Sequence, residues 1–132
     1  MNWILRAGVL AFALTTVVAV PPVFAQHHHI FDTAVEPMMT PRLNLGELNY
    51  MAKCASCHGE TARGTDKGPT FISRIYHPGH HGDRAFMLAP IQGAKAHHWK
   101  FGDMAPVDGV TDEMLKSILD YVRAVQQANG VF

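Results

Sequence analysis

The strongest periodic pattern of the chain lies close to its C-terminus. Apolar residues recur there at spacings of three and four and form one stripe: Leu115, Ile118, Leu119, Val122 and Val125. Thr111 stands at the position of a helix N-cap, and Asp112 and Glu113 follow at the positive end of the helix dipole. Residues 129–130, an Asn-Gly pair, are typical of a helix end. The pattern predicts an amphipathic helix between Thr111 and this pair.

A second helix is predicted before the first cysteine. Asn44 and Glu47 are spaced as a capping box. Four apolar residues follow the cap at helical spacing: Leu45, Leu48, Met51 and Ala52. This helix therefore leads directly into Cys54.

The chain after residue 58 is predicted to be irregular apart from one short helix. Gly, Pro, Thr and His dominate residues 59–82, and residues 93–109 also lack periodicity. Asp83 is placed to cap a short helix through Leu88, which Pro90 should kink or end because proline lacks an amide proton. No stretch alternates with period two. The fold is therefore predicted to be all-α, with three to four helices joined by long loops.

Such a domain has few apolar residues from which to build a core. Fewer than about 110 ordered residues bury limited apolar surface, and ordering two long loops costs conformational entropy. A large apolar ligand inside the domain would supply the missing surface.

The first residues have the pattern of an export signal. Arg6 is the only charged residue before the apolar run of residues 8–20. This run suits a signal-peptide core of roughly 7–15 residues and is short for a membrane span of about 20. Val23 and Ala25 are the small residues of a cleavage site. We expect a signal peptide at 1–25 and a periplasmic or otherwise exported product; an uncleaved anchor or a buried helix is the alternative.

The remaining chain divides into two parts. Residues 26–43 contain three consecutive histidines and two prolines without periodicity, and are interpreted as an irregular leader. Residues 44–132 form the folded domain. Lys plus Arg and Asp plus Glu both total 11, so the clustered positive charge of a nucleic-acid binder is missing. Cleavage after residue 25 removes one basic side chain, so net charge does not select a partner.

Cys54, Cys57 and His58 carry the most specific motif. They form Cys-Ala-Ser-Cys-His, the C-x-x-C-H pattern of c-type haem attachment. Two thiols at this spacing reach both vinyl groups of a porphyrin, and the adjacent histidine lies beneath the iron. A thioredoxin-type redox pair would need a βαβ context, and a zinc site would need a second ligand pair, which the histidines of 77–81 are available to supply. Haem attachment agrees best with the export signal, the helical pattern and the small core.

Over residues 44–129 the chain resembles the class I cytochromes c. In that family the N-terminal helix carries glycine and an aromatic residue where this chain has Gly46 and Tyr50, with the first haem cysteine four residues later. A C-terminal helix crosses at the glycine, and Ile118 and Tyr121 stand at its partner positions. The resemblance implies a small all-α cytochrome c fold wrapped around one covalently bound haem c. Ordinary helix packing explains these four positions equally well.

The resemblance also implies how the iron is held. His58 is the first ligand, and the carbonyl of Pro69 accepts its other ring N–H, although a Gly-Pro pair is also found in ordinary turns. Met104, which precedes Ala-Pro before the last helix, is implied as the sixth ligand. His97 and His98 are its rivals.

Four further residues are assigned by the same comparison or by periodicity. Trp99 is implied to contact a haem propionate, together with Lys100, or else to pack against the haem. Met87 and Met114 fall on helical faces and are assigned to the core instead of the iron.

Eight of the nine histidines lie outside the haem motif, and exposed loop positions are their ordinary explanation. Cleavage after residue 25 would leave a chain that begins Gln26-His27-His28. A histidine third from a free amine suits square-planar Cu(II), and Met38 and Met39 suit Cu(I). Copper at His27 and His28, in a cytochrome linked to copper handling, is therefore a hypothesis.

The predicted function follows from filled axial positions. Iron without an open site acts by outer-sphere electron transfer, so the chain is predicted to be a periplasmic one-electron carrier and not an enzyme. Four lysines are placed to steer acidic redox partners: Lys53, Lys67, Lys95 and Lys100. The alternatives are a haem-containing subunit of an oxidoreductase, a copper-linked cytochrome, or a haem peroxidase or gas sensor with an open sixth position. Membrane contact is expected only through a partner complex or an uncleaved signal.

Overall fold

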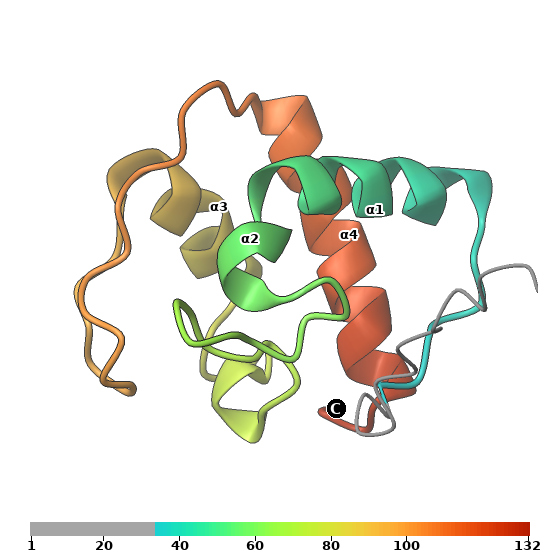
Figure 1. Ribbon diagram of the computed structural model, residues 1–132. Coiled ribbons are helices and arrows are strands. Elements are labelled where there is room, and N and C mark those ends of the chain that lie inside the picture. Colours follow the sequence, from blue (N-terminus) through green and yellow to red (C-terminus); the bar gives the residue numbers. More distant parts are fainter. Residues whose placement is uncertain (1–33) are drawn as a thin grey trace, which may run out of the picture.

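The computed structural model describes residues 34–132, and these residues form a small helical domain (Figure 1). Its elements in chain order are α1 (Pro41–Lys53), α2 (Ala55–His58), the 3₁₀ turn η1 (Arg74–Tyr76), α3 (Asp83–Gln92) and α4 (Asp112–Ala128). The described residues contain no β-strand, only one isolated bridge between Ala94 and Met104. The all-α prediction is confirmed.

Three predictions fall outside the described residues. They are the signal peptide of residues 1–25, its cleavage site, and the copper hypothesis for His27 and His28. They stay predictions. Within residues 34–132, no helix is both long enough and apolar enough to cross a membrane.

The crossing of α1 over α4 is the main packing contact (Figure 1). Gly46 lies at the crossing, where an added Cβ would overlap the carbonyl oxygen of Ser117 and lie 2.9 Å from Cβ of Tyr121. Tyr121 is therefore at the contact as predicted, whereas the closest backbone is that of Ser117 and not of Ile118. Asn49 adds a side-chain hydrogen bond of 2.8 Å to the Ser117 hydroxyl.

The start of α1 differs from the prediction. Thr40 is the N-cap, since its hydroxyl accepts a hydrogen bond from the amide of Leu43 at 3.3 Å, and Pro41 is the first helical residue. The predicted capping box at Asn44 and Glu47 is therefore wrong, because both residues lie inside the helix. Proline is favoured at the first helical position because its missing N–H is unpaired there anyway. The last residues of the predicted irregular leader, 41–43, are helical.

The bounds of α3 also differ from the prediction. Gly82 is the N-cap, so Asp83 is the first residue of the helix and not its cap. The helix continues past Pro90 to Gln92 and ends at Gly93, whose φ of 77° is accessible to glycine. Proline near the end of a short helix costs a single backbone hydrogen bond, and the carbonyl of Pro90 accepts one from the amide of Val107 at 2.8 Å.

The C-terminal helix is as predicted. The Thr111 hydroxyl caps α4 by accepting from the amide of Met114, and the helix ends at Asn129. The Asn129 side chain also bonds to both backbone groups of Val35, at 2.9 and 2.8 Å, and so ties the segment before α1 to the end of α4.

The core is small and lies mainly between α1, α2 and α4. Its central cluster comprises Tyr50, Ala55, Ala62, Leu115, Ile118, Tyr121, Val122 and Val125. No residue of α3 is fully buried, although most of its side chains are apolar. Phe86 and Met87 only pack against the edge of the cluster, and Ile91 is 48% exposed. The apolar side chains of α3 thus have little of the burial that a protein core provides.

Candidate functional site

The C-x-x-C-H motif lies where α1 passes into α2. The amide of Cys54 bonds to the carbonyl of Tyr50 as the last bond of α1, and the amide of His58 bonds back to Cys54 at 2.9 Å. Both cysteines are free thiols, Cys54 half-buried and Cys57 exposed. Burial, followed by the neighbouring Cys57, raises the pKa of Cys54 to about 11. The Cys54 thiol is therefore held in its protonated form.

His58 is the buried member of the motif, with 8% of its surface exposed. Its Nδ1 lies 2.9 Å from the carbonyl oxygen of Pro69, and its ring stacks on Phe71 at a centroid distance of 4.2 Å. Burial lowers the pKa of His58, while the bond to Pro69 acts in the opposite direction. A carbonyl only accepts, so Nδ1 carries the hydrogen and Nε2 presents a lone pair.

The loop after α2 holds Pro69 against the histidine. The Thr65 hydroxyl donates to the carbonyl of Cys57 at 2.6 Å, and the amide of Phe71 bonds to Ala62 at 2.7 Å. Gly68 packs so closely that an added Cβ would lie 2.9 Å from the Cys57 carbonyl oxygen. The Gly-Pro pair is therefore part of a braced loop that faces the motif, not an isolated surface turn.

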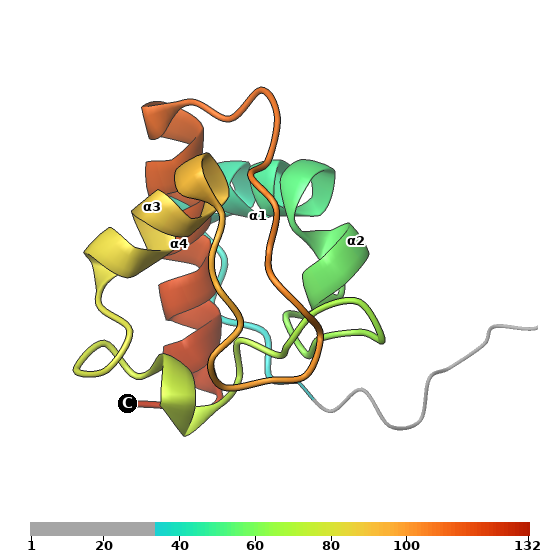
Figure 2. The ribbon, with the colours of Figure 1, turned by 90° about the vertical axis from the view of Figure 1, so that its left-hand side faces the viewer.

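Met104 lies in the long connection between α3 and α4. Figure 2 shows this connection running the length of the molecule and returning, so that its two arms lie side by side. The amide of Met104 donates to the carbonyl of Ala94 at 2.8 Å, and the carbonyl of Met104 accepts from the amide of Ala94 at 3.0 Å. This pair of bonds fixes the position of Met104 relative to the other arm of the connection. Next to it, Asp103 pairs with Lys95 at 2.7 Å. The Met104 side chain is half-buried.

Trp99, in the same connection, contains an unpaired polar group. Its indole nitrogen is buried and forms no hydrogen bond of good geometry. This nitrogen lies near the hydroxyl of Tyr76. Burial raises the pKa of Tyr76, and the nearby indole N–H partly offsets that rise. A buried N–H donor without an acceptor costs about 1–3 kcal/mol. An acceptor brought by a bound group would remove that cost.

These features fit a haem. The motif offers two thiols and an imidazole lone pair, α3 offers half-buried apolar side chains, and Trp99 offers a donor suited to a propionate. Cys54, Cys57 and His58, with Pro69 behind them, would hold the group on one side. Met104 and Trp99 come from the separate α3–α4 connection.

Other predicted residues are placed as follows. Met87 packs against the core cluster, and Met114 is half-buried on α4. Lys53 donates to the carbonyl of Asp108 at 2.9 Å. The remaining two steering candidates, Lys67 and Lys100, are exposed.

Arg123 of α4 is an organising residue that the sequence analysis missed. Its side chain is only 13% exposed and bonds to the Asp83 carboxylate at 2.9 Å. It also donates to the carbonyls of Tyr76 and His81 at 2.9 and 2.7 Å, and its guanidinium stacks over Phe86. The available signal was a basic residue next to an apolar helix stripe, which is equally typical of a solvated face. Only the tertiary contacts distinguish the two.

Four of the five histidines after residue 76 form two pairs in the sequence and one group in the structure. The rings of His97 and His98 contact those of His80 and His81. The two proposed rivals of Met104 therefore already have partners.

The chain was compared with known proteins. The cytochrome c family profile matches residues 43–126, more than half of the 132-residue sequence. The match begins in α1, ends in α4 and includes the C-x-x-C-H motif. Searches of curated proteins and of solved structures each gave no significant match.

Proposed function

The chain belongs to the cytochrome c family, and from this we propose that it is a monohaem carrier of single electrons between redox proteins of the periplasm or a similar exported compartment. The observation that carries the proposal is the geometry of His58, whose Nδ1 is bonded to Pro69 within a C-x-x-C-H motif. That bond orients the ring and leaves Nε2 as a metal ligand of raised basicity.

Haem c in this position would supply a one-electron Fe(III)/Fe(II) couple. The thiols of Cys54 and Cys57 would form its two thioether bonds, and the indole of Trp99 would donate to a propionate. The half-buried apolar side chains of α3 would gain the burial they lack. A haem buried by this packing would exchange electrons with little rearrangement of the surrounding water, which suits an electron carrier.

Met104 is proposed as the sixth ligand. A thioether is soft and neutral, so it favours reduced iron and raises the reduction potential relative to a second imidazole. With both axial positions filled, substrate would find no open position. The proposal is therefore electron transfer and not catalysis.

Localisation and partners complete the proposal. Export rests on the signal-like residues 1–25, with which the c-type haem motif agrees. Exposed Lys67 and Lys100 would steer acidic redox partners, as complementary surface charge does for association rates. Lys95 is a weaker candidate because its charge is paired with Asp103.

The visible absorption spectrum of the exported protein, oxidised and reduced, tests the proposal. A low-spin c-type spectrum is expected, with a weak sulfur-to-iron band in the oxidised form. Met104→His should abolish that band and lower the potential, whereas Met87→Leu, at a half-buried methionine of α3, should leave both unchanged. The double change Cys54→Ala and Cys57→Ala should remove covalent haem.

The outcomes separate the candidate functions. A spectrum without haem bands would contradict the proposal. A high-spin spectrum would contradict Met104 ligation and favour a peroxidase or a gas sensor. Loss of the sulfur-to-iron band in Met87→Leu and not in Met104→His would identify Met87, and not Met104, as the sixth ligand.

A further inference from the structure

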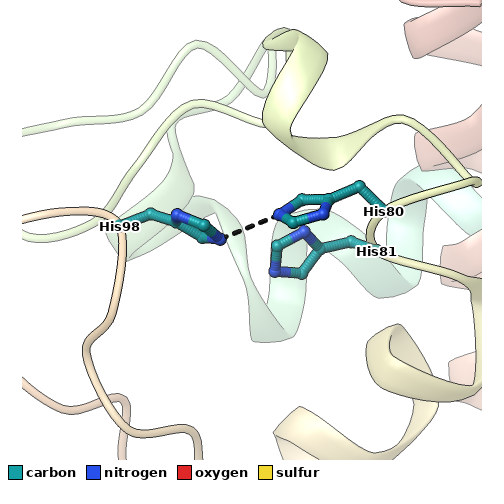
Figure 3. A group of neighbouring side chains, drawn as sticks. All are labelled: His80, His81 and His98. Atoms are coloured by element: carbon teal, nitrogen blue, oxygen red, sulfur yellow. Dashed lines mark hydrogen bonds between the residues drawn. The ribbon is translucent and has the colours of Figure 1, made fainter.

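Two loops that are far apart in the sequence bring four histidines together. His80 and His81 lie between η1 and α3, and His97 and His98 lie in the α3–α4 connection. Nε2 of His80 is 3.1 Å from Nε2 of His98, and Nε2 of His81 is 3.4 Å from Nε2 of His97. Figure 3 shows the rings of His80 and His81 directed from one loop toward His98 on the other. These four residues are called the histidine cluster.

Backbone contacts determine which nitrogens of the cluster carry hydrogen. Nδ1 of His81 lies 2.8 Å from the carbonyl oxygen of Ile75, and Nδ1 of His97 lies 2.6 Å from that of Lys95. A carbonyl oxygen only accepts, so both Nδ1 atoms are donors. In the neutral rings, Nε2 of His81 and Nε2 of His97 are then both acceptors. Two lone pairs that face each other at 3.4 Å repel, and a cation bound to both would remove this repulsion.

A metal ion between the rings can accept both of these lone pairs at once. Desolvation, and then the neighbouring His97, His80 and His81, lower the pKa of His98. The neighbouring rings thus oppose protonation of His98. Neutral imidazole is the form that binds metals.

The spacing of the nitrogens also suits a metal. Imidazole nitrogens lie about 2.0–2.1 Å from zinc, so two ligands of a tetrahedral site are about 3.3–3.4 Å apart. Two neighbouring ligands of a square-planar site at the same bond length are about 2.8–3.0 Å apart. The observed separation of 3.4 Å matches the tetrahedral value, and that of 3.1 Å lies between the two geometries. The donor atoms of His80, His81 and His98 all lie within 4.8 Å of one another.

We propose that the histidine cluster binds one divalent transition-metal ion of the copper and zinc class through its imidazole nitrogens. Imidazole suits both metals, and Cu(II) is expected to bind more tightly than Zn(II). The four histidines of the cluster are separate from His58 and Met104, the residues proposed to hold the iron.

The carbonyl bonds of the cluster serve a bound metal as well. Metal-binding histidines almost always donate their other ring N–H to a carbonyl, carboxylate or water, which fixes the tautomer and the ring orientation. Ile75 does this for His81, and Lys95 does it for His97.

Both loops are braced from outside the cluster. Arg123 donates to the carbonyls of Tyr76 and His81 and holds the first loop against α4. The Asp103 carboxylate accepts from the amide of Ala96 at 2.9 Å and from Lys95 at 2.7 Å, which fixes the turn before His97. The cluster is therefore held in place by side chains that are not themselves ligands.

His77 provides a matched control. It is exposed and lies in the same loop as His80, but its Nδ1 accepts a hydrogen bond from the amide of Gly79 at 2.9 Å. Its neutral ring therefore carries the hydrogen on Nε2, the opposite arrangement to His81 and His97. His77 should contribute nothing to the site.

The test uses the exported, haem-loaded protein with His27→Ala, His28→Ala and His29→Ala, so that the copper site hypothesised at His27 and His28 does not add to the measured binding. Cu(II) is added under calorimetric detection, with Zn(II) as competitor, and Cu(II) paramagnetic resonance reports the nitrogen ligands. One Cu(II) per chain is expected. His81→Ala and His98→Ala should each weaken binding by at least about tenfold, since even an outer partner of a ligand is worth roughly 10–100-fold. His77→Ala should leave the affinity unchanged.

The haem spectrum of each variant shows separately whether the protein is folded and loaded. Binding that survives the double change His81→Ala and His98→Ala in a folded protein would overturn the site. An equal loss in His77→Ala would also overturn it, because the effect would then not be specific to the cluster. Absence of stoichiometric Cu(II) or Zn(II) binding by the haem-loaded protein would overturn it as well, and would assign the histidines to another partner such as the haem propionates.

Discussion

Single residues in this molecule have roles that depend on one polar atom. The Pro69 carbonyl selects the tautomer of His58, and the carbonyls of Ile75 and Lys95 do the same for His81 and His97. In each case the side chain is made a potential ligand by an atom of the backbone. Residue type alone therefore does not distinguish these histidines from His77.

Trp99 allows a prediction at this scale. Its buried N–H should donate to a haem propionate, so Trp99→Phe would leave that carboxylate with more negative charge and favour oxidised iron. A hydrogen bond is worth about 0.5–1.5 kcal/mol, and only the part that differs between oxidised and reduced haem shifts the potential, so we expect the reduction potential to fall by up to about 60 mV. An equilibrium redox titration measures this shift.

Phe101, two residues after Trp99, supplies the control. It is exposed and has no polar atom in its side chain, so Phe101→Leu should leave the potential within a few millivolts, about the error of the titration. A potential that does not change in Trp99→Phe would show that the indole only packs against the haem.

At the scale of elements, the close approach of α1 and α4 depends on one glycine. Gly46→Ala would force a methyl group into the Ser117 carbonyl, and a backbone atom cannot rotate away as a side chain can. We expect the free energy of unfolding to fall by about 1–3 kcal/mol, as for other overpacked sites. Denaturant unfolding of the haem-loaded protein measures the change.

Leu48→Ala is the matched substitution in the same helix. Leu48 is 68% exposed, so its truncation should change the free energy of unfolding by less than about 0.5 kcal/mol. If Gly46→Ala were equally harmless, the two helices would be able to separate without cost, and the crossing would not be the main contact of the fold.

The whole molecule has a predicted response to alkali, because burial raises the pKa of all three tyrosines. The pKa of Tyr121 is raised to about 12 by burial and then by Glu47 and Glu36, and those of Tyr50 and Tyr76 are also raised. The unfolded chain ionises near the ordinary value of 10.0. Stability from the neutral phenols is therefore present below pH 10 and is lost as the pH rises toward 12.

We accordingly expect the free energy of unfolding to decrease above about pH 10. Phenolate absorbance should appear together with loss of helical circular dichroism and not before it. Tyr121→Phe should make the decrease less steep. Phenolate absorbance that develops near pH 10 in a fully helical protein would refute the prediction.

Local signals in the sequence were sufficient for several features. The Thr111 cap, the α4 stripe and the C-x-x-C-H motif each depend on residues within a few turns of one another, so their pattern determines the local conformation whatever the rest of the chain does. The cap of α1 was assigned wrongly because Asn44 and Glu47 satisfy the same local rule as Thr40, and the choice between them depends on where the helix meets its neighbours. The end of α3 was placed too early because a proline near a helix end costs a single hydrogen bond.

By itself, then, the sequence determined the all-α class, the family resemblance and the haem motif, because these depend on short spacings and side-chain chemistry. Only the tertiary structure decided that Arg123 braces a distant loop, and that His80 and His81 face His97 and His98. Such contacts join residues separated by long loops, and the closure of a loop is decided by the packing of the whole chain. The tautomer of each histidine ring could not be predicted from the sequence either, because it depends on which backbone carbonyl the fold brings to Nδ1.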